Sequence, residues 1–546
     1  MRSSIRLGLA VSLGLSLAAP LAAQDGPVVD APAGSAKGTA NQGVRAFRGL
    51  PYAAPPVGTQ RWKPPVAAPR WEGVRDASRF GSVCYQPVST MSSIYSDETG
   101  EMSEDCLSLN VWTPNGAEKA PVMVWIHGGS LVSGASSHRM YDGEALAKRG
   151  VVVVSINYRL GALGYLAHPD LSAESPERVS GNYGLLDQVE ALRWIRRNIA
   201  AFGGDPDNVT IAGESAGALS VMYLLAAPTA RGLFHKAILQ SAYMISTPEL
   251  TEARFGEQSA EAYGTALAAK LGARGIADLR AMDAAEIANK APATGYLPFG
   301  TIDGKILPRQ LVDTFDRGEQ APVPLLAGFN TGEIRSLRFL APPVPKSRKA
   351  YVAAIRDRYG DLADAFLRLY PEDQMEESLL ATTRDMLYGW TAERLVAKQS
   401  LLGIRSFLYL FDHGYPAADE AGLHAFHASE IPYIFGTERG TPPLWPKIPD
   451  SVDEKRFGAA MSDYWASFIA TGTPYAQRQP RWQPYAPGEA YMNFAKEPRA
   501  GFNLMPDMYE LNEAVVCRRR AQGKTPWNWN VGIVSPPLPA ATSECR

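Results

Sequence analysis

The chain has 546 residues, of which 46% are hydrophobic, and its formal net charge at pH 7 is −2. A chain of this length and composition can bury a large core. The near-neutral charge and the lack of a dense basic run exclude the usual electrostatic footprint of a nucleic-acid-binding protein. We therefore expect no nucleic-acid partner and a small, mostly uncharged ligand.

The N-terminus carries the three-part pattern of a secretory signal peptide. Two arginines precede an apolar stretch over residues 7–17, and small residues follow as far as Ala23. A membrane anchor is the alternative, but the stretch is shorter than the roughly 20 residues that span a bilayer. We expect cleavage after Ala23, which makes residues 1–23 a signal peptide and residues 24–546 a single domain with no membrane span. The mature protein is then expected to be secreted or periplasmic.

Four cysteines form two pairs that are close in sequence, Cys84 with Cys106 and Cys517 with Cys545. In an oxidising compartment this pattern favours two local disulfides. Four free thiols are the alternative, because spacing alone does not prove pairing. The sequence has no CxxC pair and no Cys/His cluster, so we expect no metal site.

Short apolar runs typical of buried strands alternate with helical patterns along most of the chain. In the segment 183–202, Leu185, Val189 and Leu192 recur at helical spacing. This alternation indicates an α/β fold in which helices cover both faces of a mostly parallel sheet. Residues 28–65 are rich in Gly and Pro and predict an irregular edge sheet. The predicted strands are 122–126, 151–156, 208–213, 237–241, 324–329 and 406–411, and helical insertions are predicted at 249–298 and 346–399.

The sequence TIAGESAGALS places a serine between two glycines, directly after one of these strands and before a helical pattern. A side chain at Gly213 or Gly217 would collide with its neighbours in a sharp turn at Ser215. The pattern G-x-S-x-G in this position predicts a nucleophile elbow, a turn that holds a serine hydroxyl clear of the sheet beside a helix N-terminus.

A serine hydroxyl needs a base to take its proton. The chain has seven histidines, and in this type of fold the base follows the last strands of the sheet. That position leaves His413, His424 and His427. His413 ends a predicted strand and is equally consistent with a structural histidine, and spacing alone does not choose among the three.

The anion of a tetrahedral intermediate needs hydrogen-bond donors. The strand 122–126 is followed by His127, Gly128, Gly129 and Ser130, where glycines let backbone N–H groups approach a substrate closely. An ordinary glycine turn is the alternative. An HGG sequence after a strand, upstream of G-x-S-x-G, favours an oxyanion loop.

Together these motifs resemble the type-B carboxylesterase family, the cholinesterase-like branch of the α/β-hydrolases. The resemblance covers nearly the whole mature chain and implies the α/β-hydrolase fold. The blocks that carry it are FRGLPYAAPPVG, SEDCLSLNVWTP, VMVWIHGG, NYRLGALGYL, GNYGLLDQVEALRWIRRNIAAFGGDPDNVTIAGESAG, FHKAILQSA, AGFNTGE, FHASEIPYIFG and YWASFIATGTP.

The resemblance implies a catalytic triad. The family's base is the histidine three residues before a glutamate, which in HASE is His427. The family's acid lies in the block GFNTGE and is Glu333, so the triad is Ser215, Glu333 and His427. Many relatives have an aspartate directly before this glutamate, whereas this chain has Gly332.

The resemblance also assigns the groups around the triad. The oxyanion donors are the backbone N–H groups of Gly129, Ser130 and Ala216, with Ser130 where relatives have glycine or alanine. Ser241 and Glu430 match residues that support the catalytic histidine, although both are also common structural features. The remaining neighbour, Glu214, either tunes the local field or is held inside the sheet.

For the cysteines, the resemblance implies a Cys84–Cys106 disulfide around a loop at the active-site entrance. Cys517–Cys545 falls outside the family pattern and rests on exclusion. The loop from 85 to 105 has no tryptophan, which speaks against a cholinesterase that stacks a choline cation there.

The expected function is hydrolysis of a small carboxylic ester through an acyl-enzyme, without a cofactor. A non-catalytic binding or adhesion protein on the same scaffold is the alternative from another class, and a lipase, amidase or peptidase is the alternative among enzymes. Pocket residues are expected in the variable segments, near Leu131, Tyr243, Met244, Leu297 and Phe339.

Overall fold

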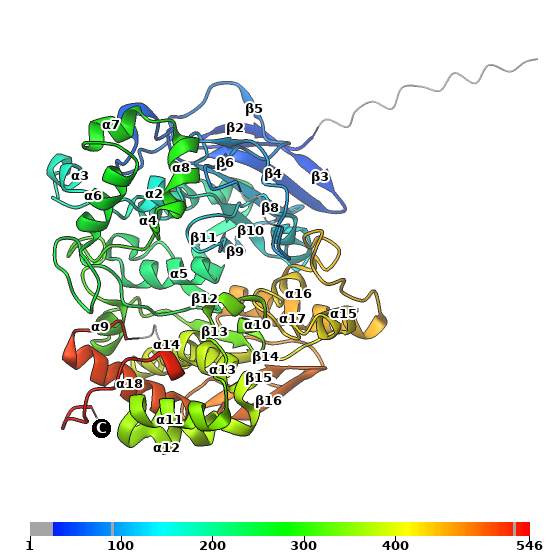
Figure 1. Ribbon diagram of the computed structural model, residues 1–546. Helices are drawn as coiled ribbons and strands as arrows, with labels where there is room; N and C mark the ends of the chain where they lie inside the picture. The colour runs from blue at the N-terminus through cyan, green and yellow to red at the C-terminus, as the bar shows by residue number, and fades with distance from the viewer. Residues whose placement is uncertain (1–25, 89–91, 528–530, 546) are drawn as a thin grey trace, which may run out of the picture.

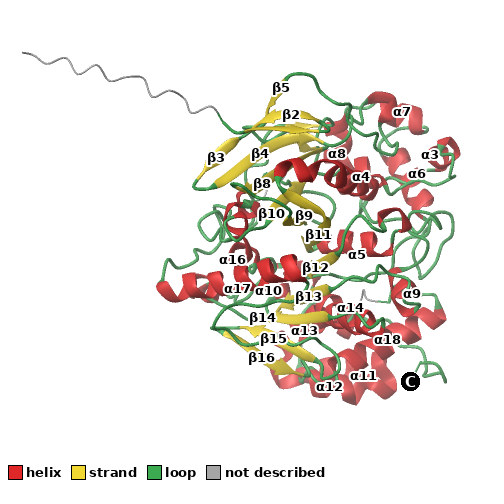
Figure 2. Cartoon of the chain, turned by 180° about the vertical axis from the view of Figure 1, so that it is seen from behind, coloured by secondary structure: helices red, strands yellow, loops and turns green. Residues whose placement is uncertain are grey.

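A large, mostly parallel sheet runs through the middle of the molecule, with helices packed along its faces (Figure 1, Figure 2). The computed structural model describes residues 26–88, 92–527 and 531–545, so the predicted signal peptide lies outside the described residues. In that part of the chain the sheet has eleven strands. Their order is β16 (Pro498–Phe502), β15 (Ala490–Phe494), β14 (Ser406–Phe411), β13 (Leu325–Asn330), β12 (Lys236–Gln240), β11 (Gly204–Glu214), β9 (Ala120–Ile126), β10 (Val152–Ile156), β8 (Ser108–Pro114), β4 (Val44–Pro51) and β3 (Thr39–Asn41).

All neighbours from β10 to β15 are parallel, while the outer pairs on both sides are antiparallel. Parallel strands need crossover connections, and the helices between them supply these. The remaining strands form small sheets near the N-terminus. One contains β1 (Val28–Ala31), β2 (Gly34–Lys37) and β5 (Val74–Asp76), and the other contains β6 (Val83–Cys84) and β7 (Met102–Ser103).

The helices fall into a group that covers the sheet and two groups inserted between strands. The covering and connecting helices are α1 (Glu144–Ala147), α2 (Gly161–Tyr165), α3 (Pro169–Glu174), α4 (Tyr183–Asn198), α5 (Ala216–Ala226), α9 (Leu311–Asp316), α10 (Glu333–Ser336), α15 (Pro416–Glu420), α16 (Ile431–Phe435), α17 (Val452–Thr471) and α18 (Met508–Gln522). The inserted helices are α6 (Ala260–Lys270), α7 (Ile276–Ala281), α8 (Ala284–Ala293), α11 (Arg348–Tyr359), α12 (Ala363–Leu369), α13 (Met375–Arg384) and α14 (Trp390–Leu401).

The central strands are buried on both faces, as their continuous apolar sequences require. In β9, Val122, Val124 and Ile126 belong to one core, which also contains side chains of α4, α5 and α14. The intervening Met123 and Trp125 belong to the opposite core, together with side chains of α16 and α17. The prediction of a mostly parallel sheet with helices on both faces is therefore confirmed.

The carboxyl ends of the parallel strands bring separate parts of the chain to one edge of the sheet. Gly128 follows β9, Ser215 follows β11, Ser241 follows β12, Glu333 lies just beyond β13, and His427 lies in the connection after β14. In open α/β sheets this edge is where ligands bind.

Candidate active site

Ser215 occupies a strained turn between β11 and α5. Its φ is 57°, in the left-handed region that non-glycine residues rarely adopt. A Cβ on Gly213 would lie 2.5 Å from the carbonyl carbon of Gly217, and a Cβ on Gly217 would lie 2.0 Å from the oxygen of Ile126. Both glycines are therefore required for the helix to start this close to β9 and β11.

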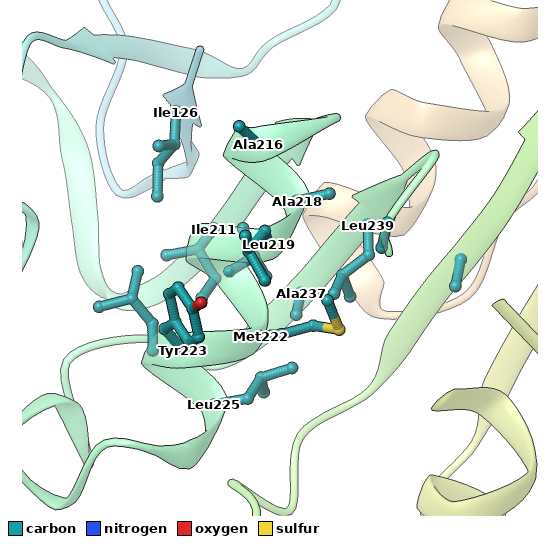
Figure 3. Close-up of a cluster of buried hydrophobic side chains, with 14 of the residues drawn as sticks. Ile126, Ile211, Ala216, Ala218, Leu219, Met222, Tyr223, Leu225, Ala237 and Leu239 are labelled. Atoms are coloured by element: carbon teal, nitrogen blue, oxygen red, sulfur yellow. The ribbon is translucent and has the colours of Figure 1, made fainter. Parts of the chain in front are cut away.

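Helix α5, which follows this turn, packs firmly against the strands beneath the site, β11 and β12. Figure 3 shows Ala218, Leu219 and Met222 of α5 lying against Ile211 of β11 and Leu239 of β12. These side chains are buried, and the Ser215 N–H donates to the oxygen of Gln240 at 2.9 Å. The serine is thus carried on a rigid support rather than on a free loop.

Glu333 and His427 are in direct contact. The Nδ1 atom of His427 forms a short hydrogen bond with Oε2 of Glu333. The other carboxylate oxygen of Glu333 accepts from the Ser241 hydroxyl at 2.6 Å and from the Asn330 N–H at 2.8 Å. Because Glu333 is fully buried and its oxygens are satisfied, it can hold one orientation of the imidazole.

The second ring nitrogen of His427 faces Glu214. Nε2 lies 3.1 Å from Oε1 of Glu214, the residue before Ser215 in the chain. Among the described residues no hydrogen bond joins the Ser215 hydroxyl to His427. The structure thus brings His427 to the residue beside the serine, with Nε2 at ion-pair distance from that residue's carboxylate. Serine–base contacts are often long before a substrate binds.

The carboxylates control the charge of His427. Burial alone would lower the pKa of His427, but the charges of Glu214 and Glu333 and the hydrogen bond to Glu333 outweigh it and raise the pKa to about 9. Burial also raises the pKa of Glu214 well above its ordinary value, against the opposing effect of His427. The imidazolium form is therefore strongly stabilised in this site.

The two supporting residues differ from the sequence-based expectation in what they touch. Ser241 donates to Glu333 and so acts on the histidine only through the acid. Glu430 accepts from the side-chain amides of Gln240 at 2.9 Å and Asn330 at 2.7 Å. Glu430 thus ties the ends of β12 and β13 together, and burial raises its pKa.

The loop after β9 presents backbone donors beside the serine. Gly129, Ser130 and Leu131 have φ values of 101°, 58° and 59°, so three successive residues are left-handed. A Cβ on Gly128 would lie 3.2 Å from Cβ of Ser215, which places the loop directly against the serine. In the described part of the chain, no hydrogen-bond acceptor engages the amides of Gly129, Ser130 and Ala216. These unpaired N–H groups have the character of an oxyanion hole.

The other two candidate histidines are engaged elsewhere. His413 has Nε2 2.9 Å from Glu454 and Nδ1 2.9 Å from the oxygen of Ala495. His424 lies between Asp419 and Asp412, at 2.8 and 3.2 Å. Of the three histidines that spacing left open, His427 is the one joined to Glu333.

Both predicted disulfides, Cys84–Cys106 and Cys517–Cys545, are formed. The loop closed by Cys84–Cys106 reaches the site through Tyr95, whose hydroxyl lies 2.7 Å from the Ser336 hydroxyl and 3.0 Å from the oxygen of His427.

The five expected pocket residues do not share one environment. Leu131 and Met244 are enclosed in the core, whereas Leu297 and Phe339 are 65% and 81% exposed. Tyr243 is half-buried and packs against Tyr388, with ring centroids 6.1 Å apart. Leu297 and Phe339 are therefore not part of an enclosed pocket.

Tyr388 is a site neighbour that the sequence interpretation missed. Its ring centroid lies 5.5 Å from that of His427. It belongs to a π-helical turn, Asp385–Gly389, between α13 and α14. Such turns are rare overall but often occur at functional sites. No residue pattern in the sequence predicts one.

The described residues contain no group of three His, Cys, Asp or Glu side chains arranged to hold a metal ion. No helix formed by them is long and apolar enough to cross a membrane.

Comparison with known proteins identifies relatives along most of the chain. The carboxylesterase family model matches residues 25–511. The fumonisin B1 esterase of Sphingopyxis macrogoltabida is 36% identical over 84% of this chain and 85% of its own, and the para-nitrobenzyl esterase of Bacillus subtilis is 39% identical over 81% and 89%. A solved structure of the Geobacillus stearothermophilus carboxylesterase has a TM-score of 0.76 at 32% identity, covering 89% of this chain and 99% of that one. The chain therefore belongs to the carboxylesterase family and is a serine hydrolase of carboxylic esters with the α/β-hydrolase fold.

Proposed function

We propose that Ser215, His427 and Glu333 form the catalytic triad of this esterase. The observation that carries the proposal is the convergence of a strained serine turn, a buried Glu333–His427 pair and three unpaired amides at one edge of the sheet. The order of the three residues along the chain is that of the α/β-hydrolases.

In the first step, neutral His427 takes the hydroxyl proton of Ser215 while the serine oxygen bonds to the ester carbonyl carbon. The oxyanion accepts hydrogen bonds from the N–H groups of Gly129, Ser130 and Ala216. The tetrahedral intermediate then collapses, and the imidazolium gives its proton to the departing alcohol. Glu333 stabilises the imidazolium and holds its tautomer.

In the second step, His427 takes a proton from water as the water oxygen attacks the acyl-serine carbonyl. Collapse of this intermediate returns the proton to Ser215 and releases the carboxylic acid. For both steps, the Nε2 atom of His427 must turn from Glu214 toward Ser215.

Replacing the triad residues tests this assignment. Ser215→Ala removes the nucleophile and is expected to lower kcat for a p-nitrophenyl ester by about 10⁴-fold or more. His427→Ala is expected to be similarly severe, whereas His424→Ala serves as the matched control and leaves most activity. A folded Ser215→Ala protein that retains turnover would contradict the triad. So would a His424→Ala variant with a lower kcat than the His427→Ala variant. Parallel assays on an anilide and on an emulsified long-chain triglyceride distinguish an amidase or lipase from an esterase.

We further propose that residues 1–23 direct export and that residues 24–546 act as one catalytic domain. Two disulfides suit an oxidising compartment. N-terminal sequencing of the protein recovered outside the cytoplasm is expected to begin at Gln24. An uncleaved chain retained in the membrane fraction would show that the segment is an anchor.

A further inference from the structure

We propose that the hydroxyl groups of Tyr243 and Tyr388 bind a neutral oxygen acceptor of the substrate, such as an ether or ketone oxygen close to the scissile ester. This inference rests on the proposed function and narrows its substrate class. It starts from two tyrosines beside His427 whose rings are packed while their hydroxyls are unused.

The two rings form a contiguous wall next to the base. Tyr388 lies against His427 with a centroid distance of 5.5 Å, and Tyr243 meets Tyr388 edge-on at 6.1 Å and 87°. Tyr388 is 3% exposed and Tyr243 is half-buried. Two aromatic rings so close to the base lie within reach of a bound ester.

The wall is held rigidly by a shared hydrogen bond network. The Thr391 hydroxyl donates to the oxygen of Leu387 at 2.7 Å, within the π-helical turn that carries Tyr388. The Thr391 hydroxyl oxygen in turn accepts from the Met244 N–H at 2.9 Å, next to Tyr243. One threonine therefore joins the two segments, and the tyrosines are positioned as a pair.

Neither hydroxyl is used by the protein. Among the described residues, buried tyrosines such as Tyr52, Tyr158 and Tyr351 donate to backbone oxygens, whereas no hydrogen bond engages the hydroxyl of Tyr243 or Tyr388. The described residues include buried polar atoms that are sealed from solvent and lack a hydrogen-bond partner, but the hydroxyls of Tyr243 and Tyr388 are not among them. Buried tyrosine hydroxyls are normally hydrogen-bonded, so two unpaired ones beside His427 point to a partner from outside the protein.

The surrounding charges select the kind of partner. Burial and the neighbouring carboxylates, including Glu333 and Glu214, raise the pKa of Tyr388 well above its ordinary value, so it remains a neutral donor. When His427 is neutral, as a base must be, the same carboxylates repel an anionic group placed beside them. A neutral oxygen, which accepts a hydrogen bond without bringing charge, fits this position best.

Two pairs of isosteric esters test the proposal, because each pair exchanges one CH₂ for an oxygen. In the acyl arm, p-nitrophenyl methoxyacetate is compared with p-nitrophenyl butyrate. In the alcohol arm, 2-methoxyethyl acetate is compared with butyl acetate. The ratio of kcat/KM within each pair is measured for the wild type, Tyr388→Phe, Tyr243→Phe and the exposed control Tyr475→Phe. Dividing each variant's ratio by that of the wild type removes the greater intrinsic reactivity of the methoxyacetyl group.

We expect each of the two Phe variants, but not Tyr475→Phe, to lower the ratio about fivefold in one arm, the effect of losing one neutral hydrogen bond. The arm that responds identifies whether the acceptor lies in the acyl or the alcohol group. If the kcat/KM ratios of both Phe variants equal that of the wild type in both arms, the proposal is overturned. This holds whether the variants keep full turnover or lose it equally on both members of a pair. Equal loss on both members would mean that the hydroxyls only support the site. A wild type inactive on all four esters would instead reject the proposed function itself, and this proposal with it.

Discussion

Gly332 lies directly before Glu333, the acid of the proposed triad. A Cβ at this position would lie 2.6 Å from the oxygen of Leu423 and 2.8 Å from that of Ala425. The Gly332 N–H also donates to the Ala425 oxygen at 2.8 Å. The glycine thus lets the connection that carries His427 pack directly on the segment that carries Glu333. Glu333 itself accepts hydrogen bonds from the Ser241 hydroxyl and the Asn330 N–H.

Glu214 is the residue whose charge we expect to set the pH dependence. The proposed base, His427, can take a proton only when it is neutral, and its pKa is raised to about 9 largely by Glu214 and Glu333 against the effect of burial. kcat/KM should therefore rise with pH toward about pH 9. Glu214→Gln removes one of the charges that favour the imidazolium, so the rising limb should move to lower pH by about one unit or more.

This shift is measured by following acid release from an ester at a series of pH values between about 5 and 10. The exposed carboxylate variant Glu72→Gln is the control and should keep the wild-type profile. A Glu214→Gln profile with the same midpoint as the wild type would mean that the contact between Glu214 and Nε2 does not influence the free enzyme.

At the scale of elements, the junction of β9, β11 and α5 determines where the serine stands. The helix begins one residue after Ser215, and its first turn touches the end of β9 through Gly217. Small residues at the start of α5 let strand and helix approach without a layer of side chains between them. The hydroxyl and the unpaired amides then occupy the same few ångströms of the sheet edge.

Adding one methyl group at this junction should separate the helix from the strand. In Gly217→Ala the new Cβ would lie 2.0 Å from the Ile126 oxygen, which is backbone and has little freedom to move. We expect a loss of about 1–3 kcal/mol in the free energy of unfolding, together with a large loss of kcat. Urea denaturation and ester assays measure the two effects.

Gly488→Ala is the matched control, because its nearest neighbours are Phe502 ring atoms at 3.7 and 3.8 Å. That variant should remain within about 0.5 kcal/mol of the wild type, as expected for a surface change. Wild-type stability and activity in Gly217→Ala would show that the close approach of α5 to β9 is not needed.

The sequence was most informative where local pattern and tertiary role coincide. The predicted strand 406–411 matches β14 residue for residue, because its continuous apolar run is buried on both faces. The predicted strand 208–213 starts later than β11, whose first residues are polar and pair with β9 only through a register shift. Polar residues recruited by a neighbouring strand carry no apolar signal.

In the site, the motifs gave Ser215 and the glycine loop directly, but the choice of His427 needed a family resemblance. Tyr388 and the contact from Glu214 to His427 were not predictable from spacing. Both depend on how segments far apart in sequence meet at the sheet edge. The π-helical turn that delivers Tyr388 has no local residue signature.

At the scale of the whole molecule, the C-terminal segment after α18 closes over distant parts of the fold. Trp527 is fully buried, meets Phe255 edge-on at 5.0 Å and donates to the Met244 oxygen at 3.4 Å. Further on, Leu538 donates to the oxygen of Arg358 at 2.7 Å. The Cys517–Cys545 disulfide ties the end of this segment back to α18.

Breaking that disulfide should lower stability without removing the catalytic groups. Cys517 and Cys545 close a loop with a sequence separation of 28, for which chain entropy in the unfolded state predicts about 3–4 kcal/mol. We expect Cys517→Ser to lower Tm while kcat at 25 °C stays near the wild-type value. Calorimetry under oxidising conditions measures the change, with the exposed variant Ser543→Ala as control. An unchanged Tm would mean that the last residues add nothing to the folded state.

The position of Trp527 also has a consequence for biogenesis. Its partner Met244 is made 283 residues earlier, so the segment beside Tyr243 must wait for nearly the last residues of the chain before its packing is complete. A ribosome stalled before Trp527 holds a polypeptide with Ser215, Glu333 and His427 already synthesised but an unfilled space the size of an indole next to Met244. Packing around Met244 is therefore completed only after Trp527 has joined the fold, wherever the chain folds.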